Sequence, residues 1–490
     1  MSNKINYVKD IHGNTLFLDD ELVGKGGQGF VFRTKDNNIA IKLLAKNGEI
    51  IEDAELAKKY SEIIEEAIVL DLPNNINVCR PETILEPPYC GYTMRLLDSN
   101  TLVSLKDAIA PNDYKELNSQ FPLKKRVELL IELSRTLSVL HSRGFVYCDL
   151  SPNNILFAPK TEGLSKVWLI DCDNLRKTSD VRTSIFTPDY GAPEIVKGLK
   201  HNNIYSDIYS FAVIAFKVLT GLHPLFVNYN DGTSSGGWDS TTVATETDAQ
   251  VVDSIYIGDT EFEKYNEVVE RLSLCTNKKL VTMFSKVFSS KEDNDETKRP
   301  LMNEWYEALV SLYTHIGVCE HCGASVLVGS KTCSVCESAI RTKPTEYLVV
   351  KQCYSGSYID EVIELIKNDE EYTLYKNDDG EIPNEDELKA SLWRSSIKDL
   401  FNIVLYDGKI IYSFELKKES IEDVPAPMIR VESAKDESLI IRIIGDLKLC
   451  DASENPIGDF RISKGKSAGC YVAGDFKAKT TLIRLNFVNQ

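Results

Sequence analysis

The 490-residue sequence predicts an α+β fold in two lobes, the first rich in β-strands and the second helical, followed by a small cysteine-rich segment and a β-rich end. Three observations predict this arrangement. Short β-rich runs separated by turn residues occupy residues 15–43, long helices with periodic apolar residues follow from residue 123, and two Cys-x-x-Cys pairs come after residue 318. A chain of this length exceeds one compact core and suggests roughly three domains.

Composition and charge restrict the class of protein. With 43% hydrophobic and 27% charged residues, the chain has the make-up of a folded globular protein. The net charge of -18 is not relieved by any long basic tract, and a nucleic-acid interface needs clustered Lys and Arg, so we expect no nucleic-acid partner. The N-terminus lacks an apolar signal core, and the run Phe211–Leu219 is too short to span a bilayer. We therefore expect a cytoplasmic protein without a membrane partner.

The first lobe should consist of strands and one helix. The alternation of apolar and turn residues predicts strands over 15–18, 30–33 and 39–42. Residues 49–70 are rich in Glu, Ala, Leu and Lys with apolar positions at helical spacing, which indicates a helix. Two further strands are expected near Ile84 and over 91–97.

The second lobe should be mostly helical. The apolar spacing of Leu123–Ser142 predicts a long amphipathic helix that ends before Gly144. The run Ile204–Thr220 is apolar on most sides, which indicates a buried helix, and Pro300–Thr314 is the last helix of this part. Residues 228–248 and 288–298 have the polar composition of loops.

A glycine-rich segment lies between the first two strands. Residues 24–31 read Gly-Lys-Gly-Gly-Gln-Gly-Phe-Val and fit the pattern G-x-G-x-x-G-x-V. Glycines let a backbone turn fold closely over phosphates and direct its N–H groups at them. A dinucleotide-binding turn has a similar pattern but opens a helix, whereas residues 30–33 continue as a strand. The context therefore favours a nucleotide flap over an ordinary turn.

Three polar residues follow in an order that indicates phosphoryl-transfer chemistry. Asp149 and Asn154 form an Asp-Leu-x-x-x-Asn motif, and Asp171 ends the apolar run 167–170. Upstream, Lys42 ends the strand Ile39-Ala40-Ile41-Lys42 just after the glycine hairpin. Each of these signals is weak when it occurs alone. Their succession in one chain is much more specific.

The segment 15–314 resembles the bacterial serine/threonine protein kinases of the eukaryotic type, and the fold that this implies is the bilobal protein-kinase fold. The resemblance implies that Asp149 is the catalytic base and that Lys42 pairs with Glu66, with Glu65 as an open alternative. It further implies that Asn154 and Asp171 bind Mg²⁺ or Mn²⁺. The residues that it assigns to ATP are Gly24, Gly26, Gly29, Val31, Ala40, Lys42, Asn154 and Asp171, with Met94, Arg95 and Leu96 at the adenine hinge.

Other landmarks support the resemblance, and three positions depart from it. Asp207 resembles the helix aspartate that braces the catalytic loop, and Glu194 with Arg299 resembles the buried ion pair of the family. The family triplet His-Arg-Asp is Tyr-Cys-Asp at 147–149, so the arginine that reads a phosphate on the activation segment is absent. Two further departures are Ser151, where many such kinases have Lys, and the triplet Asp171-Cys172-Asp173, which replaces Asp-Phe-Gly. These departures bear on regulation and catalytic rate more than on the reaction itself.

The cysteines at 319, 322, 333 and 336 form the second site. Two Cys-x-x-Cys turns separated by ten residues can close four thiolates into a tetrahedron around Zn²⁺. A redox dithiol needs only one pair, so we predict a structural zinc ribbon with ligands Cys319, Cys322, Cys333 and Cys336. The last kinase helix followed by such a ribbon also resembles a narrower group of bacterial kinases that occur with phosphatase and von Willebrand A-type partners in tellurite-resistance-type systems.

These assignments divide the chain into an N-terminal extension (1–14), a kinase domain (15–316, with lobes 15–97 and 98–316), a zinc ribbon (317–342), a mixed α/β module (343–425) and a small β-rich module (426–490). The predicted function is an ATP- and Mg²⁺-dependent kinase acting on protein substrates, with a C-terminal targeting region. The alternative is a pseudokinase or scaffold in which nucleotide binding switches partner interactions. A third possibility makes the tail the functional part and the kinase domain its regulator.

Overall fold

The computed structural model describes the chain except for residues 1–4, 27–28, 37, 99, 112, 162, 182–183, 227–254, 261, 290–294, 341–343, 369–383, 417–419 and 474–480. The predicted loop 228–248 therefore lies outside the described residues. The chain forms two compact units, Met1–Leu309 and Val310–Gln490. This division falls before the predicted end of the second lobe at residue 316.

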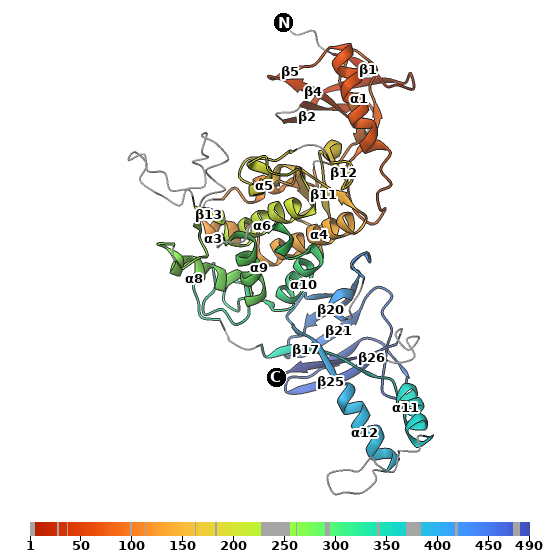
Figure 1. Cartoon of the computed structure of the whole chain (residues 1–490). Coiled ribbons are helices and arrows are strands. Elements are labelled where there is room, and N and C mark those ends of the chain that lie inside the picture. The colour runs from red at the N-terminus through yellow and green to blue at the C-terminus, as the bar shows by residue number, and fades with distance from the viewer. Residues whose placement is uncertain are drawn as a thin grey trace. The chain divides into compact units, whose positions relative to one another are not determined.

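The N-terminal part of the first unit is an antiparallel sheet with the strand order β1-β2-β3-β4-β7-β6 and with β5 paired to β4 (Figure 1). Helix α1 (Ala54–Ile68) packs against β6 and β7. The strands are β1 (Tyr7–Lys9), β2 (Thr15–Gly26), β3 (Gly29–Thr34), β4 (Ile39–Lys46), β5 (Glu49–Ile50), β6 (Pro81–Ile84) and β7 (Gly91–Arg95).

Two expectations for this part need correction. The helix predicted over 49–70 begins only at Ala54, because the Asp53 side chain accepts the N–H groups of Glu55 and Leu56 and caps the helix there. The residues before it pair with β4 as β5. Residues 7–9 of the predicted extension also belong to the sheet, since β1 pairs with β2 in the register Tyr7↔Phe17.

The helical part of the first unit has two buried helices at its centre, α4 (Leu123–Ser142) and α6 (Ile204–Thr220), which pack against each other and match the predicted ranges. Asn203 caps the start of α6 through the N–H groups of Tyr205 and Ser206, and Gly221 ends it at φ 74°. The other helices are α2 (Leu105–Ala108), α3 (Tyr114–Gln120), α5 (Pro193–Val196), α8 (Tyr265–Cys275), α9 (Lys278–Phe288) and α10 (Met302–Tyr313).

Short strands and 3₁₀ turns carry the polar motifs between these helices. The strands are β8 (Val103–Ser104), β9 (Phe145–Val146), β10 (Ile155–Phe157), β11 (Val167–Leu169), β12 (Arg176–Lys177), β13 (Leu225–Phe226) and β14 (Ile255–Tyr256), and the turns are η1 (Pro152–Asn154), η2 (Cys172–Asn174) and η3 (Glu296–Lys298). Strands β10 and β11 are antiparallel neighbours, and β12 pairs with β9. The two motif segments around Asp149 and Asp171 are thereby held side by side.

The second unit begins with a hairpin of β15 (Ile316–Val318) and β16 (Ser325–Leu327), followed by a six-stranded sheet and a four-stranded sheet. The larger sheet has the order β18-β17-β26-β25-β22-β23 and the smaller one β19-β20-β21-β24. The elements are β17 (Glu346–Tyr354), α11 (Gly356–Asn368), α12 (Glu385–Ser396), β18 (Lys398–Val404), β19 (Ile410–Tyr412), α13 (Ser413–Leu416), β20 (Pro427–Ser433), β21 (Leu439–Ile443), β22 (Leu449–Cys450), β23 (Pro456–Ile457), β24 (Phe460–Ile462), β25 (Lys466–Val472) and β26 (Thr481–Asn489).

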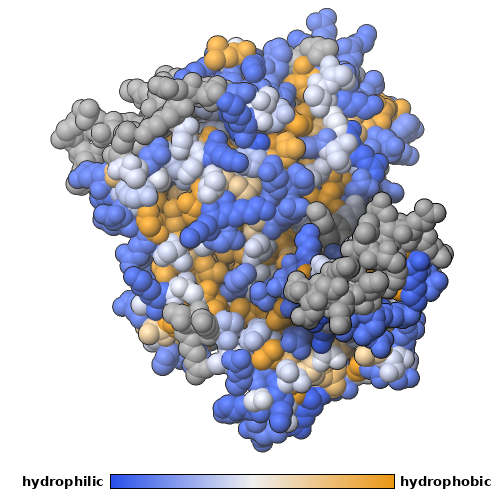
Figure 2. All heavy atoms as spheres, turned by 60° about the horizontal axis from the view of Figure 1, so that its bottom comes forward, coloured by the Kyte–Doolittle hydropathy of each residue, from blue (hydrophilic) through white to orange (hydrophobic). Residues whose placement is uncertain are grey.

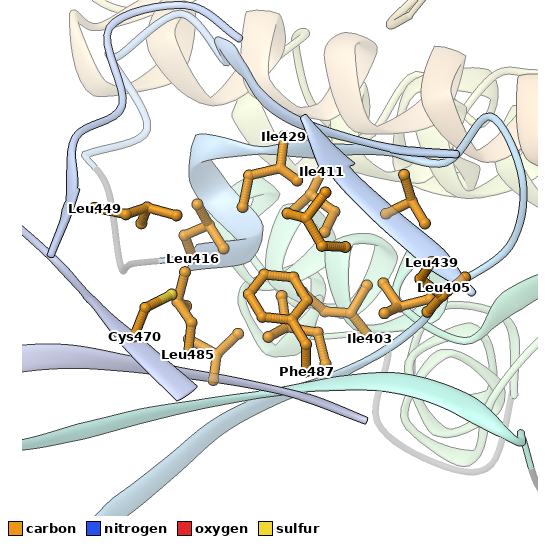
Figure 3. Packing of buried hydrophobic residues seen from close by; sticks show 14 of the residues in the cluster. Ile403, Leu405, Ile411, Leu416, Ile429, Leu439, Leu449, Cys470, Leu485 and Phe487 are labelled. Carbon is orange, nitrogen blue, oxygen red and sulfur yellow. The ribbon is translucent and has the colours of Figure 1, made fainter. Parts of the chain in front are cut away.

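The predicted division of this tail at residue 425 is wrong, because one core joins its two halves. β17 pairs with β26 along its whole length, from Glu346↔Asn489 to Tyr354↔Thr481. Side chains of both halves point toward one another in this core, among them Ile403, Ile411 and Phe487 (Figure 3). The small β-rich module predicted over 426–490 therefore needs the strands before residue 425 to complete its core.

On the face drawn in Figure 2, hydrophobic residues occur in small groups among hydrophilic ones. In the part of the chain that the structure describes, no helix combines the length and apolar character that crossing a bilayer requires.

Candidate active site and cysteine cluster

The loop that carries Asp149 follows β9, and its backbone is hydrogen-bonded to Asp207 of α6. The Asp207 carboxylate is almost fully buried and accepts the backbone N–H groups of Tyr147 (2.7 Å) and Cys148 (3.0 Å). His141 of α4 lies 3.1 Å from the same carboxylate. These contacts hold Cys148 at φ 73°, a left-handed conformation that a cysteine rarely adopts. The predicted role of Asp207 as a brace of this loop is confirmed.

Asp149 lies among polar partners at the end of this loop. The Asn154 amide donates to the Asp149 carbonyl oxygen at 2.9 Å and lies 3.2 Å from its carboxylate, so the Asn154 nitrogen is engaged and its oxygen is left for another ligand. The Thr187 hydroxyl donates to the other carboxylate oxygen at 2.7 Å. The sequence alone does not single out Thr187 from the other hydroxyl residues of its segment. Its spacing before Ala192-Pro193-Glu194 was the available signal, and it does not by itself indicate a contact with Asp149.

The environment of Asp149 changes its acidity. Burial raises the pKa of this carboxyl, the Thr187 hydrogen bond opposes that rise, and the nearby charge of Asp171 adds to it. A carboxylate with a raised pKa accepts a proton more readily than an exposed aspartate does.

Asp171 follows β11 and turns the chain sharply. It has φ 58° and ψ 44° and precedes the turn η2. Its carboxylate contacts the Lys42 ammonium, and Asp173 lies 3.1 Å from the same nitrogen. Burial alone would lower the pKa of Lys42, but the carboxylates of Asp173 and Asp171 outweigh burial and raise it. Lys42 is therefore an ammonium ion in contact with two carboxylates.

The predicted pair of Lys42 and Glu66 is not formed in the described structure. The Glu66 side chain is 64% exposed and lies 3.3 Å from Arg176 Nε, and Glu65 is exposed as well. The reason is the position of η2, which places two carboxylates closer to Lys42 than any glutamate of α1. The spacing of glutamates along a predicted helix does not say how far that helix lies from Lys42, so the sequence could not exclude this pair.

The glycine segment forms the paired ends of β2 and β3, with Gly26 opposite Gly29, while residues 27–28 lie outside the described residues. A Cβ atom at Gly29 would come within 2.3 Å of the Leu43 carbonyl oxygen. Gly29 is therefore required by the close approach of β3 to β4. A Cβ atom at Gly24 would meet only ordinary contacts at 3.8 Å, so packing does not explain the glycine there.

The remaining residues predicted to bind ATP lie on neighbouring strands. Val31 is opposite Lys42, and Ala40 is opposite Met94. Met94 packs in part against Ile64 and other apolar residues beneath α1. The N–H of Leu96 donates to the Asn38 carbonyl at 2.8 Å. That N–H is engaged, so hydrogen bonds to adenine would have to come from other backbone groups near Arg95.

The predicted ion pair between Glu194 and Arg299 is confirmed. The guanidinium binds both carboxylate oxygens, at 2.7 and 2.9 Å, and also donates to the Tyr205 carbonyl at 3.0 Å. A bidentate pair of this kind is strong and directional. It ties the segment after Thr187 to the loop before α10.

The four cysteines of the predicted ribbon converge in the second unit. Their sulfur atoms all lie within 4.8 Å of one another, with Cys319 and Cys336 3.6 Å apart and Cys322 and Cys333 3.7 Å apart. A tetrahedral zinc site with Zn–S bonds of about 2.3 Å has sulfur atoms about 3.8 Å apart, so the cluster fits this ion. Hydrogen bonds from Ser338 lower the pKa of the Cys336 thiol to about 6, whereas burial raises the pKa of the Cys333 thiol, so in the absence of a metal only Cys336 is favoured as a thiolate.

The two cysteine turns have the same backbone hydrogen-bond pattern. The carbonyl of Cys319 accepts the N–H of Gly323 at 2.8 Å, and the carbonyl of Cys333 accepts the N–H of Glu337 at 3.0 Å. Gly323 and Glu337 both have positive φ, 73° and 60°. Each turn thus presents its two sulfurs on one side. His321 is not part of the cluster among the described residues.

Comparison with known proteins agrees with this geometry. Residues 17–306, more than half of the chain, match the model of the protein kinase domain. The serine/threonine-protein kinase PknD of Chlamydia felis is 30% identical over 223 residues, which cover 41% of this chain and 23% of that protein. The kinase PkaB of Streptomyces coelicolor is 27% identical over 218 residues, covering 42% of this chain and 48% of PkaB. The matched segments thus span from less than a quarter to about half of these relatives.

Proposed function

The chain belongs to the protein kinase family, and from this premise we propose that it transfers the γ-phosphoryl group of ATP to serine and threonine hydroxyls of protein substrates. The observation that carries the proposal is the convergence of Asp149, Asn154 and Asp171 with Lys42 in one site. A scaffold that only binds partners does not need this complete set. The cytoplasmic location predicted from the sequence stays part of this proposal.

In this proposal each residue has a limited task, because phosphoryl transfer depends on positioning and charge neutralisation. Asn154 and Asp171 would hold Mg²⁺, which neutralises charge on the transferring phosphate. Asp149 would orient the acceptor hydroxyl and take its proton. Thr187 already places a hydroxyl 2.7 Å from Asp149, so this carboxylate is within reach of a hydroxyl donor.

The first prediction tests the catalytic base. Asp149→Asn removes the proton acceptor without changing the shape of the side chain, so transfer from radiolabelled ATP to a generic protein acceptor should fall at least about 100-fold. Binding of a non-hydrolysable ATP analogue, measured by calorimetry, should remain.

Lys42→Met and Asp171→Asn should also abolish transfer. The exposed residue Asp71 offers the control Asp71→Asn, which should behave as wild type. Full activity in Asp149→Asn would refute the assignment, and an inert wild-type protein that binds ATP would indicate a pseudokinase.

The second prediction concerns pH. Asp149 must be ionised to accept a proton, and the Thr187 hydroxyl stabilises its ionised form. Thr187→Ala should therefore raise the pKa of Asp149 and move the acidic limb of the kcat/KM profile to higher pH. Thr187→Ser keeps a hydroxyl and should keep the wild-type limb. An unchanged limb in Thr187→Ala would contradict the coupling.

The third prediction is that activation does not require phosphorylation of the segment 177–187. Cys148 replaces the arginine that would pair with a phosphate, and burial raises the pKa of its thiol, so it is neutral. Instead Cys148 packs with Val146 and with Val181 of the segment. Asn202 adds hydrogen bonds to the Cys148 carbonyl (3.1 Å) and to the Ile185 backbone. The segment is thus anchored by unmodified groups.

The test is a combined Ala variant of Thr178, Ser179, Thr183 and Ser184, with Thr187 left intact because it contacts Asp149. Thr183 lies outside the described residues. The same holds for Arg182, a basic residue that could replace the missing arginine. Activity should stay within about threefold of wild type, as for surface substitutions. A loss above tenfold at an unchanged melting temperature would show that a hydroxyl of this segment is needed.

We also propose that Cys319, Cys322, Cys333 and Cys336 bind a structural Zn²⁺ that stabilises the start of the second unit. The segment is short and apolar packing around it is limited to a few residues such as Val326 and Ile340, so metal binding would supply folding free energy. Four thiolates leave no open coordination position, which fits a structural rather than a catalytic ion. Partners of the phosphatase or von Willebrand A type stay an expectation from the narrower resemblance.

The fourth prediction follows from this zinc proposal. Elemental analysis should find about one zinc per chain, and Cys333→Ser should lose it and increase proteolysis near residue 320. Cys353→Ser changes a buried cysteine outside the cluster and should retain the metal. Transfer to a small generic substrate should largely survive Cys333→Ser. A stoichiometric disulfide without metal in freshly purified protein would contradict the site.

A further inference from the structure

Asp173 occupies the third position of the triplet that begins at Asp171, where the family more often has glycine. Its carboxylate lies 3.1 Å from Lys42 Nζ, and its side chain is only 13% exposed. Its second oxygen is buried and has no hydrogen-bond partner among the described residues. A buried carboxylate in contact with the buried Lys42, which is 4% exposed, is not part of the ordinary solvated surface.

Metal binding would change the partners of Lys42. If Asp171 binds Mg²⁺, as in the proposed function, at least one oxygen of its carboxylate would face the metal, and Lys42 would depend more on Asp173. A buried ammonium without a partner is costly. Asp173 is already within hydrogen-bond distance of Lys42 Nζ. Its second oxygen has no partner among the described residues, so it could also contact the ammonium when Lys42 moves toward the phosphate oxygens.

The alternative partner, Glu66, is held by Arg176. The guanidinium of Arg176 lies 3.3 Å from Glu66 and donates to the Ile63 carbonyl of α1 at 3.2 Å. The same group donates to the Asp173 carbonyl at 2.7 Å and to the Leu175 carbonyl at 2.8 Å. Arg176 therefore fixes the backbone of Asp173 while it neutralises the glutamate that would otherwise compete for Lys42.

We propose that Asp173, and not Glu66, is the residue that positions Lys42 for the phosphates of ATP. This inference rests on the proposed function, since it assigns a partner to a lysine of the same site. Asp173 acts through Lys42 and is a positioning residue. Glu66 in turn has a second role, as the anchor of Arg176 on α1.

The test compares Asp173→Asn with Glu66→Gln, two substitutions that each remove one charge and keep the shape of the side chain. Loss of a charge-assisted hydrogen bond should lower kcat in Asp173→Asn about 10- to 100-fold, with a smaller rise in the KM for ATP, and the loss in Glu66→Gln should be at least tenfold smaller. Asp173→Gly restores the common residue of the triplet without adding bulk and should lose kcat as well. Glu62→Gln, on the exposed side of α1, is the matched control and should equal wild type.

A readout without turnover separates this inference from the proposed function. In a crystal structure of the wild-type protein with Mg²⁺ and a non-hydrolysable ATP analogue, Lys42 Nζ should stay within hydrogen-bond distance of Asp173, below about 3.2 Å. A Lys42–Glu66 pair in that complex, or an Asp173→Asn enzyme as active as wild type, would overturn the inference while the kinase function stands. An inert wild-type enzyme that retains the Lys42–Asp173 contact would refute the function and leave the pairing intact.

Discussion

The geometry of the site depends on the hydrogen bonds that the carboxylate of Asp207 accepts. This carboxylate is almost fully buried in α6 and takes two backbone N–H groups of the loop before Asp149, with His141 of α4 beside it. Such a group must be satisfied, because a buried carboxylate without donors is costly. In the loop that satisfies it, Cys148 has the left-handed conformation, and the next residue, Asp149, contacts Asn154 and Thr187. One buried charge thereby determines where the proposed base lies.

The sequence was sufficient where local chemistry defines an element. Helices α4 and α6 have their predicted ranges because apolar periodicity, the Asn203 cap and Gly221 define α6 and a turn at Gly144 follows α4. The Asp149–Asn154 contact follows from five-residue spacing in one tight loop. By contrast, the partner of Lys42 depends on how α1 and η2 are placed in three dimensions, and β17 joins β26 across more than a hundred residues. Neither the partner of Lys42 nor the pairing of β17 with β26 is indicated by residues that are close in the sequence.

The departures of this chain from the family pattern are connected in space. Cys148 is a small apolar residue at a position where the family has a cation, and Val181 packs on it. Cys172 is fully buried, so its thiol takes the place of a large ring in the turn that carries Asp173. At both positions a small buried residue stands where the family has a charged or a large side chain. This is the basis of the proposal that the segment needs no modification to become ordered.

The charges around Lys42 explain why the site is suited to a divalent cation. Three carboxylates, those of Asp149, Asp171 and Asp173, face one ammonium, while Arg176 and Glu66 neutralise each other nearby. If all three are ionised, two negative charges remain after the charge of Lys42 is counted, and this excess favours the binding of a cation. In the proposed function, one Mg²⁺ held by Asp171 and Asn154 would balance that excess. If Lys42 is paired with Asp173, as we propose, the phosphates of ATP would then meet a site without excess negative charge.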